Sequence, residues 1–348
     1  MRREENIKPK MCFVLPEKAE DTATHFAHKW ELIKELRNEV EFYTYAATGM
    51  DLLRVISARF RGVRTYYVHY SFKGALIAWF VTVLFGGKVF YWNCGMPWLY
   101  KRGLIEEYVF QFILCHVFLV TATDGLANEY TEHYGLNKKN IRVVPNYIRV
   151  SRVGNKTKKE ARRELGLGQD KKIVLFLHHL SRRKGADLLP EIIQTFQNKG
   201  DVLFVIVGDG PERKNIELQA SRFKVQDCVR FEGKIPNNKI ASYFAAADVY
   251  LMPSEEEGMP NALLEAMAAG VPFVASDVAA VREMTPPMTH EFVLPYGDIN
   301  QFSEKIEKLL ADEELRKRIS TEEQEWVGRY DVSIIARKFL ELLKEETI

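Results

Sequence analysis

The sequence predicts an α/β protein with two doubly wound domains, each a parallel sheet with helices on both faces. Two observations support this prediction. Short apolar runs alternate with helix-like stretches along the 348 residues, which is the pattern of βαβ units. A polar, basic stretch at 151–159 interrupts the alternation, which then starts again. A chain of this length favours two domains, so we place them at residues 1–150 and 151–330.

In the first half, strands are expected where apolar and β-branched residues run together, and helices where apolar residues recur with helical spacing. The expected strands are 11–15, 40–45, 66–69, 89–92, 117–121 and 141–144, and the expected helices are 24–36, 75–85 and 125–134. The window 74–87 is the most apolar of the chain, but it is shorter than the roughly 20 residues that cross a bilayer. We interpret it as a buried helix, with membrane contact as the alternative.

The second half repeats the pattern. The expected strands are 173–177, 202–207, 229–231, 249–252 and 271–275, followed by a charged helical region at 302–344 that is broken near 330–333; a helix is expected at 185–196. The run 202–207 is apolar throughout, as in a parallel strand covered on both faces. Two such domains in tandem would face a cleft at the carboxyl ends of their strands, where ligands of doubly wound sheets bind.

Composition narrows the function classes. The chain is 47% hydrophobic and 28% charged with a net charge of +2, which is ordinary for a globular enzyme and gives no reason to expect nucleic acid. Residues 1–150 hold 20 Lys/Arg against 15 Asp/Glu, an excess that suits an anionic membrane or an acidic acceptor but also ordinary surface variation. The four cysteines are widely spaced, so we expect reduced thiols, a cytoplasmic protein and no metal or other cofactor.

The most informative segment is 254–270, with the sequence SEEEGMPNALLEAMAAG. Gly258 and Pro260 favour a turn after an apolar strand. Asn261 is a good N-cap for the helix that follows, and Gly270 is placed to end it. The segment therefore predicts a loop that leads directly into a helix N-terminus.

Two carboxylates flank this predicted helix N-terminus. Glu257 lies on the loop, and Glu265 is expected near the first turn of the helix. The free N–H groups of a helix N-terminus bind anions, so a phosphate could lie there with hydroxyl groups on the two carboxylates. A nucleotide-sugar has this layout of ribose, diphosphate and sugar. The alternative is a helix cap with two solvated acids.

Other strand ends carry candidate ligand-binding residues. The segment 178–185, HHLSRRKG, places Arg183 and Lys184 on a strand-to-helix loop, where cations meet phosphate in such sheets. His178 and His179 begin the same loop and could contact phosphate or sugar. Turns after two later strands are candidates for backbone contacts to a base, and they contain Gly208, Gly233 and Ile235.

Together these segments resemble the retaining glycosyltransferases of group 1, family 4, which have two Rossmann-like domains in the GT-B arrangement. The resemblance is strongest over 170–300 and includes 177–185, 208–211, 247–254 and 257–272. It implies that a final helix, 331–348, crosses back to the N-terminal domain. It also implies an N-terminal acceptor domain and a C-terminal donor domain.

The resemblance implies roles for the site residues. Glu257 would contact the donor sugar near its anomeric carbon, Glu265 would hold the ribose hydroxyls, and Lys184 would bind the diphosphate without a metal. Backbone N–H groups of the loop would also contact the donor, apart from Pro260, which has none; the loop residues are Gly258, Met259, Pro260 and Asn261. On the acceptor side we name His69, and Asn93, which stands where many members have a histidine.

Two departures from the family pattern bear on these roles. His179 stands where the family usually has an arginine, and Arg183 could compensate. The N-terminal glycine-rich loop is replaced by residues 16–24. The leading hypothesis is a transferase that moves a sugar from a nucleotide-sugar to a lipid-linked, polysaccharide or other glycan acceptor. The alternatives are a nucleotide-sugar epimerase or a phosphorylase of related fold, or an inactive GT-B subunit that binds a partner enzyme.

A membrane is a further expected partner. The segment 52–64 is amphipathic and carries Arg54, Arg59, Arg61 and Arg64, and it precedes the apolar window 74–87. Basic amphipathic helices bind anionic lipid surfaces. The sequence therefore predicts a peripheral protein on the inner face of the plasma membrane, attached through its N-terminal half.

Overall fold

The structure is a computed structural model, and it describes residues 8–16, 27–47, 49–153 and 156–344. The chain forms two compact units. Unit 1 comprises residues 1–145 and 332–348, and unit 2 comprises residues 146–331. The chain therefore passes into unit 2 at Asn146, a few residues before the expected boundary, and its last helix belongs again to unit 1. Each unit has a six-stranded sheet whose paired strands are parallel, so the predicted fold class is confirmed.

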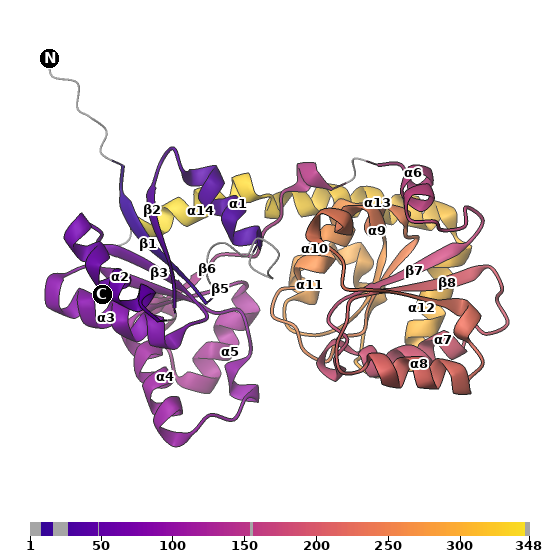
Figure 1. The fold of residues 1–348 in the computed structure, drawn as a ribbon, viewed down its shortest axis with the longest axis horizontal. Coiled ribbons are helices and arrows are strands. Elements are labelled where there is room, and N and C mark those ends of the chain that lie inside the picture. The colour runs from indigo at the N-terminus through magenta and orange to yellow at the C-terminus, as the bar shows by residue number, and fades with distance from the viewer. Residues whose placement is uncertain (1–7, 17–26, 48, 154–155, 345–348) are drawn as a thin grey trace, which may run out of the picture. The chain divides into compact units, whose positions relative to one another are not determined.

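Unit 1 has the strand order β2-β1-β3-β4-β5-β6 (Figure 1). The strands are β1 Lys10–Leu15, β2 Glu41–Ala46, β3 Thr65–His69, β4 Lys88–Trp92, β5 Phe118–Thr121 and β6 Ile141–Val143. The order reverses between β1 and β3, which makes this edge the topological switch point of unit 1. The residues that follow β1, 17–26, include most of the loop 16–24 and the start of the expected helix 24–36, and they lie outside the described residues.

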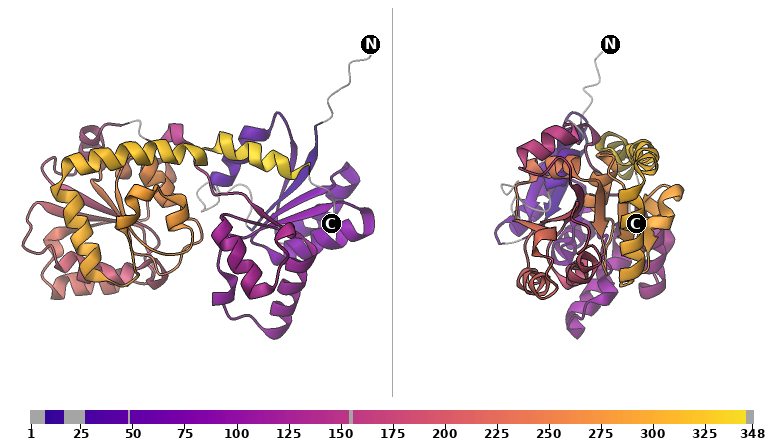
Figure 2. Two further views of the ribbon diagram at one scale, coloured as in Figure 1. Left: turned by 180° about the vertical axis from the view of Figure 1, so that it is seen from behind. Right: turned by 90° about the vertical axis from the view of Figure 1, so that its right-hand side faces the viewer.

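The helices of unit 1 cover its sheet. They are α1 Ala27–Leu36, α2 Asp51–Ala58, α3 Phe72–Phe85, α4 Leu104–His116, α5 Asp124–Tyr134 and α14 Val332–Leu342. A core of buried apolar side chains lies between the sheet and α2 to α5, with Tyr66, Ala78 and Ile113 among its members. α14 packs beside α1, as the yellow and indigo helices in Figure 2 show. The terminal helix is thus part of unit 1 although it begins 189 positions after the end of β6 in sequence.

Unit 2 has the strand order β12-β11-β10-β7-β8-β9. The strands are β7 Lys172–Leu177, β8 Val202–Val207, β9 Val229–Gly233, β10 Val249–Met252, β11 Phe273–Ser276 and β12 Val293–Leu294. Read from β9, this is the dinucleotide-binding order 3-2-1-4-5-6, in which the order of strands across the sheet reverses between the first and fourth strands. β7 and β10 are those strands and pair in parallel. The switch point of unit 2 is therefore the carboxyl edge of β7 and β10.

The helices of unit 2 pack on this sheet around an apolar core that contains Phe196, Phe204 and Ile306. They are α6 Lys158–Glu164, α7 Leu189–Gln194, α8 Arg213–Arg222, α9 Ile240–Ala246, α10 Asn261–Ala268, α11 Val281–Met284, α12 Ile299–Ala311 and α13 Glu313–Val327. Asp298 and Asp312 cap α12 and α13 with their side chains. Gly270, with φ +66°, ends α10 as predicted.

Several local predictions were wrong. The stretch 151–159 is not all linker, because Thr157 forms a capping box and α6 starts at Lys158. The expected helix 185–196 begins with the 3₁₀ turn Ala186–Leu188 and is α-helical only in α7. Asn261 does not cap α10: Pro260 holds the N-cap position and Asn261 is the first helical residue. The apolar window 74–87 is only half buried, since the C-terminal residues of α3 are exposed.

Candidate functional site

The loops that follow β7 and β10 meet at the switch point of unit 2. Gly185, with φ +67°, approaches the β10 loop so closely that a Cβ there would lie 1.8 Å from the carbonyl oxygen of Pro253. The backbone N–H groups of Glu255 and Glu256 donate to the Arg183 carbonyl at 3.0 and 3.2 Å. A glycine is required at this contact because any side chain would push the loops apart. The two loops are thus held together as one structural element.

A buried ion pair lies at the centre of this element. Oε1 of Glu257 is 2.7 Å from Nζ of Lys184 and 3.1 Å from Nε2 of His178. Glu257 also accepts a hydrogen bond from Ser254 Oγ at 2.9 Å, and Lys184 donates to the carbonyl of Glu256 at 3.3 Å. The exposed fractions of Glu257 and Lys184 are 6% and 8%. An ammonium has three N–H donors, and two acceptors contact Lys184 within the described ranges, so one donor remains for a further acceptor.

The ionisation of this cluster follows from its burial and its charges. Burial opposes the ionisation of Glu257, but His178 and Lys184 outweigh it and lower the pKa of Glu257 to about 2. Burial is also the main effect on His178 and lowers its pKa, against the attraction of Glu257. At neutral pH the cluster therefore holds an anionic Glu257 and a cationic Lys184, with a neutral His178 as hydrogen-bond donor.

Glu265 offers a second carboxylate, in the second turn of α10. It is half-buried, and among the described residues its carboxylate has no hydrogen-bond or ion-pair partner. Burial raises the pKa of Glu265 to about 7. The hydroxyl of Tyr250 is buried and has no hydrogen-bond partner in the part of the chain that the structure describes, and the charges of Glu257 and Glu265 add to burial in raising its pKa. Tyr250 therefore lies close to both carboxylates, beneath the site.

The N-terminus of α10 provides N–H donors beside the ion pair. Within the described part of the chain, the amides of Gly258, Met259, Asn261 and Ala262 donate to no acceptor. Pro260 has no N–H but serves as the N-cap residue, and its carbonyl accepts from the next turn. Free N–H groups and the helix dipole favour an anion at this point. The site thus combines one available cationic donor, a helix end and two carboxylates.

Glycines also bring the loops after β8 and β9 against this edge. A Cβ on Gly208, with φ +130°, would lie 1.9 Å from the carbonyl oxygen of His178, and the Gly208 N–H donates to the Gly233 carbonyl at 2.8 Å. Gly233 has φ +68°, and Ile235 follows it half-buried. These residues pack the β7, β8 and β9 loops together, and their direct contact with a ligand remains a prediction.

The structure brings together Lys184, Glu257, Glu265 and the α10 turn, but other predicted residues lie differently. Arg183 is exposed, and its guanidinium lies 3.7 Å from the Glu256 carboxylate. His179 is also exposed, and its backbone N–H donates to Nδ1 of His178. Met259 is buried, and both its sulfur and its carbonyl accept hydrogen bonds from Asn146.

Two of the predicted residues belong to unit 1. His69 is buried in β3 between the rings of Phe13 and Trp92. Asn93 follows β4, and its side chain donates to the Tyr91 hydroxyl and accepts from the Gly95 N–H. Both residues lie at the carboxyl edge of the unit 1 sheet, where doubly wound domains bind ligands.

The sequence named His178 and His179 alike as candidates, and the structure shows that His178 contacts Glu257. Two other contributors were not predicted. Ser254 stands in the motif itself, three residues before the glutamate it donates to. Tyr250 lies in an apolar strand, and the only feature that sets it apart is a hydroxyl group at a buried position.

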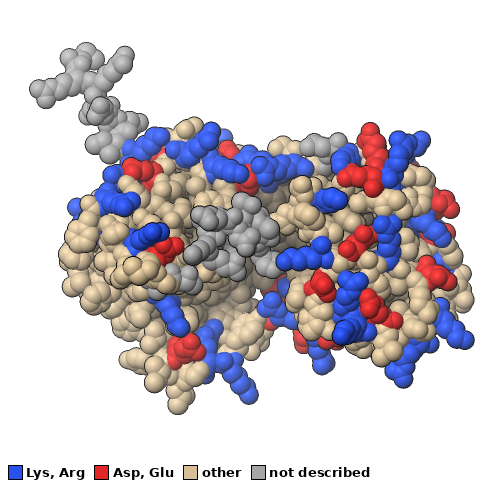
Figure 3. Space-filling model, in the orientation of Figure 1, with Lys and Arg blue, Asp and Glu red and all other residues tan. Residues whose placement is uncertain are grey.

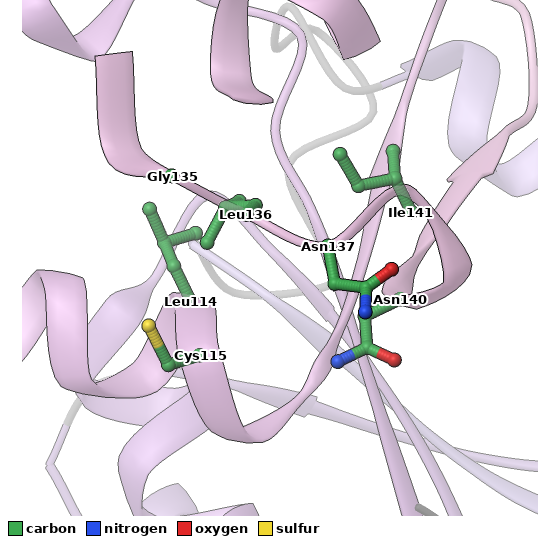
Figure 4. A pocket seen from close by; sticks show the side chains of 7 residues that line it. All are labelled: Leu114, Cys115, Gly135, Leu136, Asn137, Asn140 and Ile141. Atoms are coloured by element: carbon green, nitrogen blue, oxygen red, sulfur yellow. The ribbon is translucent and has the colours of Figure 1, made fainter. Parts of the chain in front are cut away.

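A cavity of about 220 Å³ lies elsewhere, in unit 1 (Figure 4). It is lined by Leu114, Cys115, Gly135, Leu136, Asn137, Asn140 and Ile141. These residues lie just before β5 and at the start of β6, so the cavity is at the amino edge of the sheet, opposite the edge where ligands of such folds bind. It contains none of the predicted site residues.

A doubly wound unit with an anion site at its switch point is typical of nucleotide-binding proteins. The family model described as Glycosyl transferases group 1 matches residues 157–326, nearly the whole of unit 2. The putative teichuronic acid biosynthesis glycosyltransferase TuaC of Bacillus subtilis is 34% identical over 155 residues, which are 44% of this chain and 37% of that protein. The N-acetyl-alpha-D-glucosaminyl L-malate synthase of Bacillus anthracis is 30% identical over 213 residues, 60% of this chain and 54% of that protein. The chain thus spans from about a third to about half of the length of these relatives.

The similarity of fold extends over both units. Anabaena Alr3699/HepE in complex with UDP matches with a TM-score of 0.82 at 15% identity, and the match covers 97% of this chain and all of that one. At this identity the likeness establishes the fold alone. That fold is GT-B, the two-unit arrangement predicted from the sequence.

Proposed function

We propose that this chain is a retaining glycosyltransferase of group 1, family 4, with a nucleoside-diphosphate sugar as donor and a glycan or lipid-linked acceptor. The observation that carries the proposal is the buried Lys184–Glu257 pair beside the open N-terminus of α10, within the segment that matches the family. Unit 2 would bind the donor and unit 1 the acceptor, in the cytoplasm. The structures of HepE with UDP and with UDP-glucose support a donor of this class for the same fold.

Each polar group of the site has a part in this reaction. The remaining donor of Lys184 and the free N–H groups of α10 would bind the diphosphate, and Glu265 would accept hydrogen bonds from the ribose. Glu257 holds the Lys184 ammonium in place and would face the sugar near its anomeric carbon. His69 and Asn93 would contribute to the acceptor site of unit 1.

The chemistry needs stabilisation of the leaving group. The bond from the anomeric carbon to the β-phosphate oxygen breaks, and the acceptor oxygen bonds to the same face of that carbon. The acceptor proton passes to the leaving phosphate oxygen. Negative charge grows on the diphosphate as the bond breaks, and fixed N–H donors with a buried ammonium stabilise such charge strongly. These groups are on the protein, so the proposed reaction uses no metal.

The proposal is tested first by donor binding. Thermal shifts with UDP-, GDP- and ADP-sugars should show stabilisation by at least one of them, because a ligand of the folded state raises the melting temperature. Lys184→Ala and Glu257→Gln should each lower turnover with that donor at least tenfold while the protein stays folded. The control is Arg182→Ala, whose side chain is on the same 3₁₀ turn but contacts Asp187 instead. Wild-type turnover in either site variant would refute the assigned roles.

A further inference from the structure

Unit 1 exposes apolar side chains on two neighbouring helical segments. α2 and α3 pack against each other on one face of the sheet. Their exposed apolar residues, which we call the α2–α3 patch, are Met50, Leu53, Ile56, Phe60, Phe80, Val83, Leu84 and Phe85. In Figure 3 the surface over these helices is largely uncharged, whereas unit 2 shows charged side chains of both signs. Monomeric proteins seldom expose so large an apolar patch without a binding role.

Side-chain contacts connect the two segments of the patch. The rings of Phe60, in the 3₁₀ turn Arg59–Arg61, and Phe85, at the end of α3, are 6.0 Å apart and meet edge to face. Arg59 donates to the Phe85 carbonyl at 2.9 and 3.3 Å, which closes the C-terminus of α3. Phe60 is 78% exposed and Leu84 is 58% exposed, although both belong to ordered elements.

The charges around the patch are almost all positive. Residues 50–64 and 72–85 contain five basic residues and one acidic residue, Asp51. The Asp51 carboxylate is bound to Arg54 at 2.8 Å. Arg61 and Arg64 are exposed and have no ion-pair partner within the described residues. The patch therefore fits an anionic surface with an apolar layer beneath it.

The length of α3 decides how it could meet a bilayer. Its 14 residues are apolar on nearly every face, yet they extend only about 21 Å, less than the roughly 30 Å of a hydrocarbon core. No helix among the described residues is long and apolar enough to cross a membrane. Helices that lie in the interface of a bilayer combine apolar side chains with neighbouring arginines, whose aliphatic stems lie along the apolar surface while their charged ends stay in water.

We propose that the α2–α3 patch docks on an anionic lipid bilayer. The apolar side chains enter the headgroup region, and Arg61 and Arg64 bind lipid phosphates at its edge. This inference deepens the proposed function by placing the acceptor-binding unit at a membrane, but its observations are independent of the donor site.

The experiment is vesicle co-sedimentation with the full chain. Vesicles of phosphatidylcholine with 30 mole per cent phosphatidylglycerol are compared with pure phosphatidylcholine in low salt and at 0.5 M NaCl. We expect binding to the anionic vesicles that weakens in high salt, since salt screens the attraction between the arginines and the lipid phosphates. Phe60→Ser with Leu84→Ser should lower the partition coefficient at least tenfold, and Arg61→Gln with Arg64→Gln should lower it at least tenfold in low salt only.

Matched controls come from α8 in unit 2. Leu218 is 60% exposed, and Lys214 and Arg222 are exposed on the same helix. Leu218→Ser and Lys214→Gln with Arg222→Gln should leave vesicle binding unchanged. Wild-type protein that does not bind anionic vesicles in low salt, or equal losses in the α8 controls, would overturn the proposal. So would light scattering that shows a dimer broken by Phe60→Ser with Leu84→Ser. Thermal shifts with the donor are measured on the same variants. A donor shift without vesicle binding would contradict the membrane proposal alone and leave the proposed function intact.

Discussion

Glu257→Gln tests the electrostatics of the site through stability. Glutamine has the shape of the protonated carboxyl, so it should mimic Glu257 at very low pH. A pKa lowered from 4.5 to about 2 contributes about 3 kcal/mol to folding at pH 7. Because the folded pKa is the lower one, this contribution is complete above pH 4.5 and is lost as the pH falls towards 2. The free-energy difference between wild type and Glu257→Gln should therefore be about 3 kcal/mol at pH 7 and about 1 kcal/mol at pH 3.

The assay must report on unit 2 alone, because two units can unfold separately. Four of the five tryptophans precede residue 100, whereas Trp326 lies in unit 2 and donates to the Met284 carbonyl. In protein labelled with 5-fluorotryptophan, the ¹⁹F resonance of Trp326 would follow urea unfolding of unit 2 at each pH. The control is Glu255→Gln, an exposed carboxylate two residues away, which should change stability by less than about 0.5 kcal/mol. A difference for Glu257→Gln that stays constant from pH 7 to pH 3 would refute the reasoning.

Two further predictions concern the carboxyls of Glu265 and Glu323. Since hydrogen bonds from ribose favour an ionised Glu265, whose free pKa is about 7, calorimetry with the nucleotide-sugar that the thermal-shift screen selects should show affinity falling about tenfold from pH 8 to pH 6. Glu265→Gln should remove this dependence, and an unchanged slope would reject Glu265 as the ribose ligand. Both oxygens of Glu323 on α13 are buried without a partner in the described part of the chain, and burial raises its pKa well above the usual value. The folded state thus retains a proton that the unfolded chain releases, so stability should fall as the pH rises above 4.5. Glu323→Leu should abolish that fall and add about 1–3 kcal/mol at pH 7 in the Trp326 assay, whereas a loss of stability would contradict it.

The strands could be predicted more fully than the helices, for a physical reason. Strands buried on both faces are continuous apolar runs, so β8 and β10 have the predicted bounds. β12 has only two residues and leaves no run to detect. α4 begins with exposed Leu104 and Ile105, which hide the helical periodicity on which prediction depends.

The site could be predicted in its parts but not in its assembly. The sequence indicates that Lys184 and Glu257 each follow a strand, but they are 73 positions apart. That their strands are neighbours is a property of the sheet, since β10 pairs with β7 across the reversal in strand order. The helix start also differs from the prediction: the Pro260 carbonyl accepts from the next turn, so Asn261, a good N-cap by propensity, is the first residue inside the helix.

The charge balance of the site bears on how it would hold a diphosphate. Lys184 and Glu257 cancel, and His178 is neutral, so the buried cluster adds almost no net charge. A bound diphosphate would then depend on directed donors: the third N–H of Lys184 and the free amides of α10, whose positions the interlocked loops fix. Exposed Arg182 and Arg183 would add attraction at longer range, and such attraction is screened by salt. Donor affinity should accordingly depend only weakly on ionic strength. A steep dependence would instead assign the diphosphate to the exposed arginines.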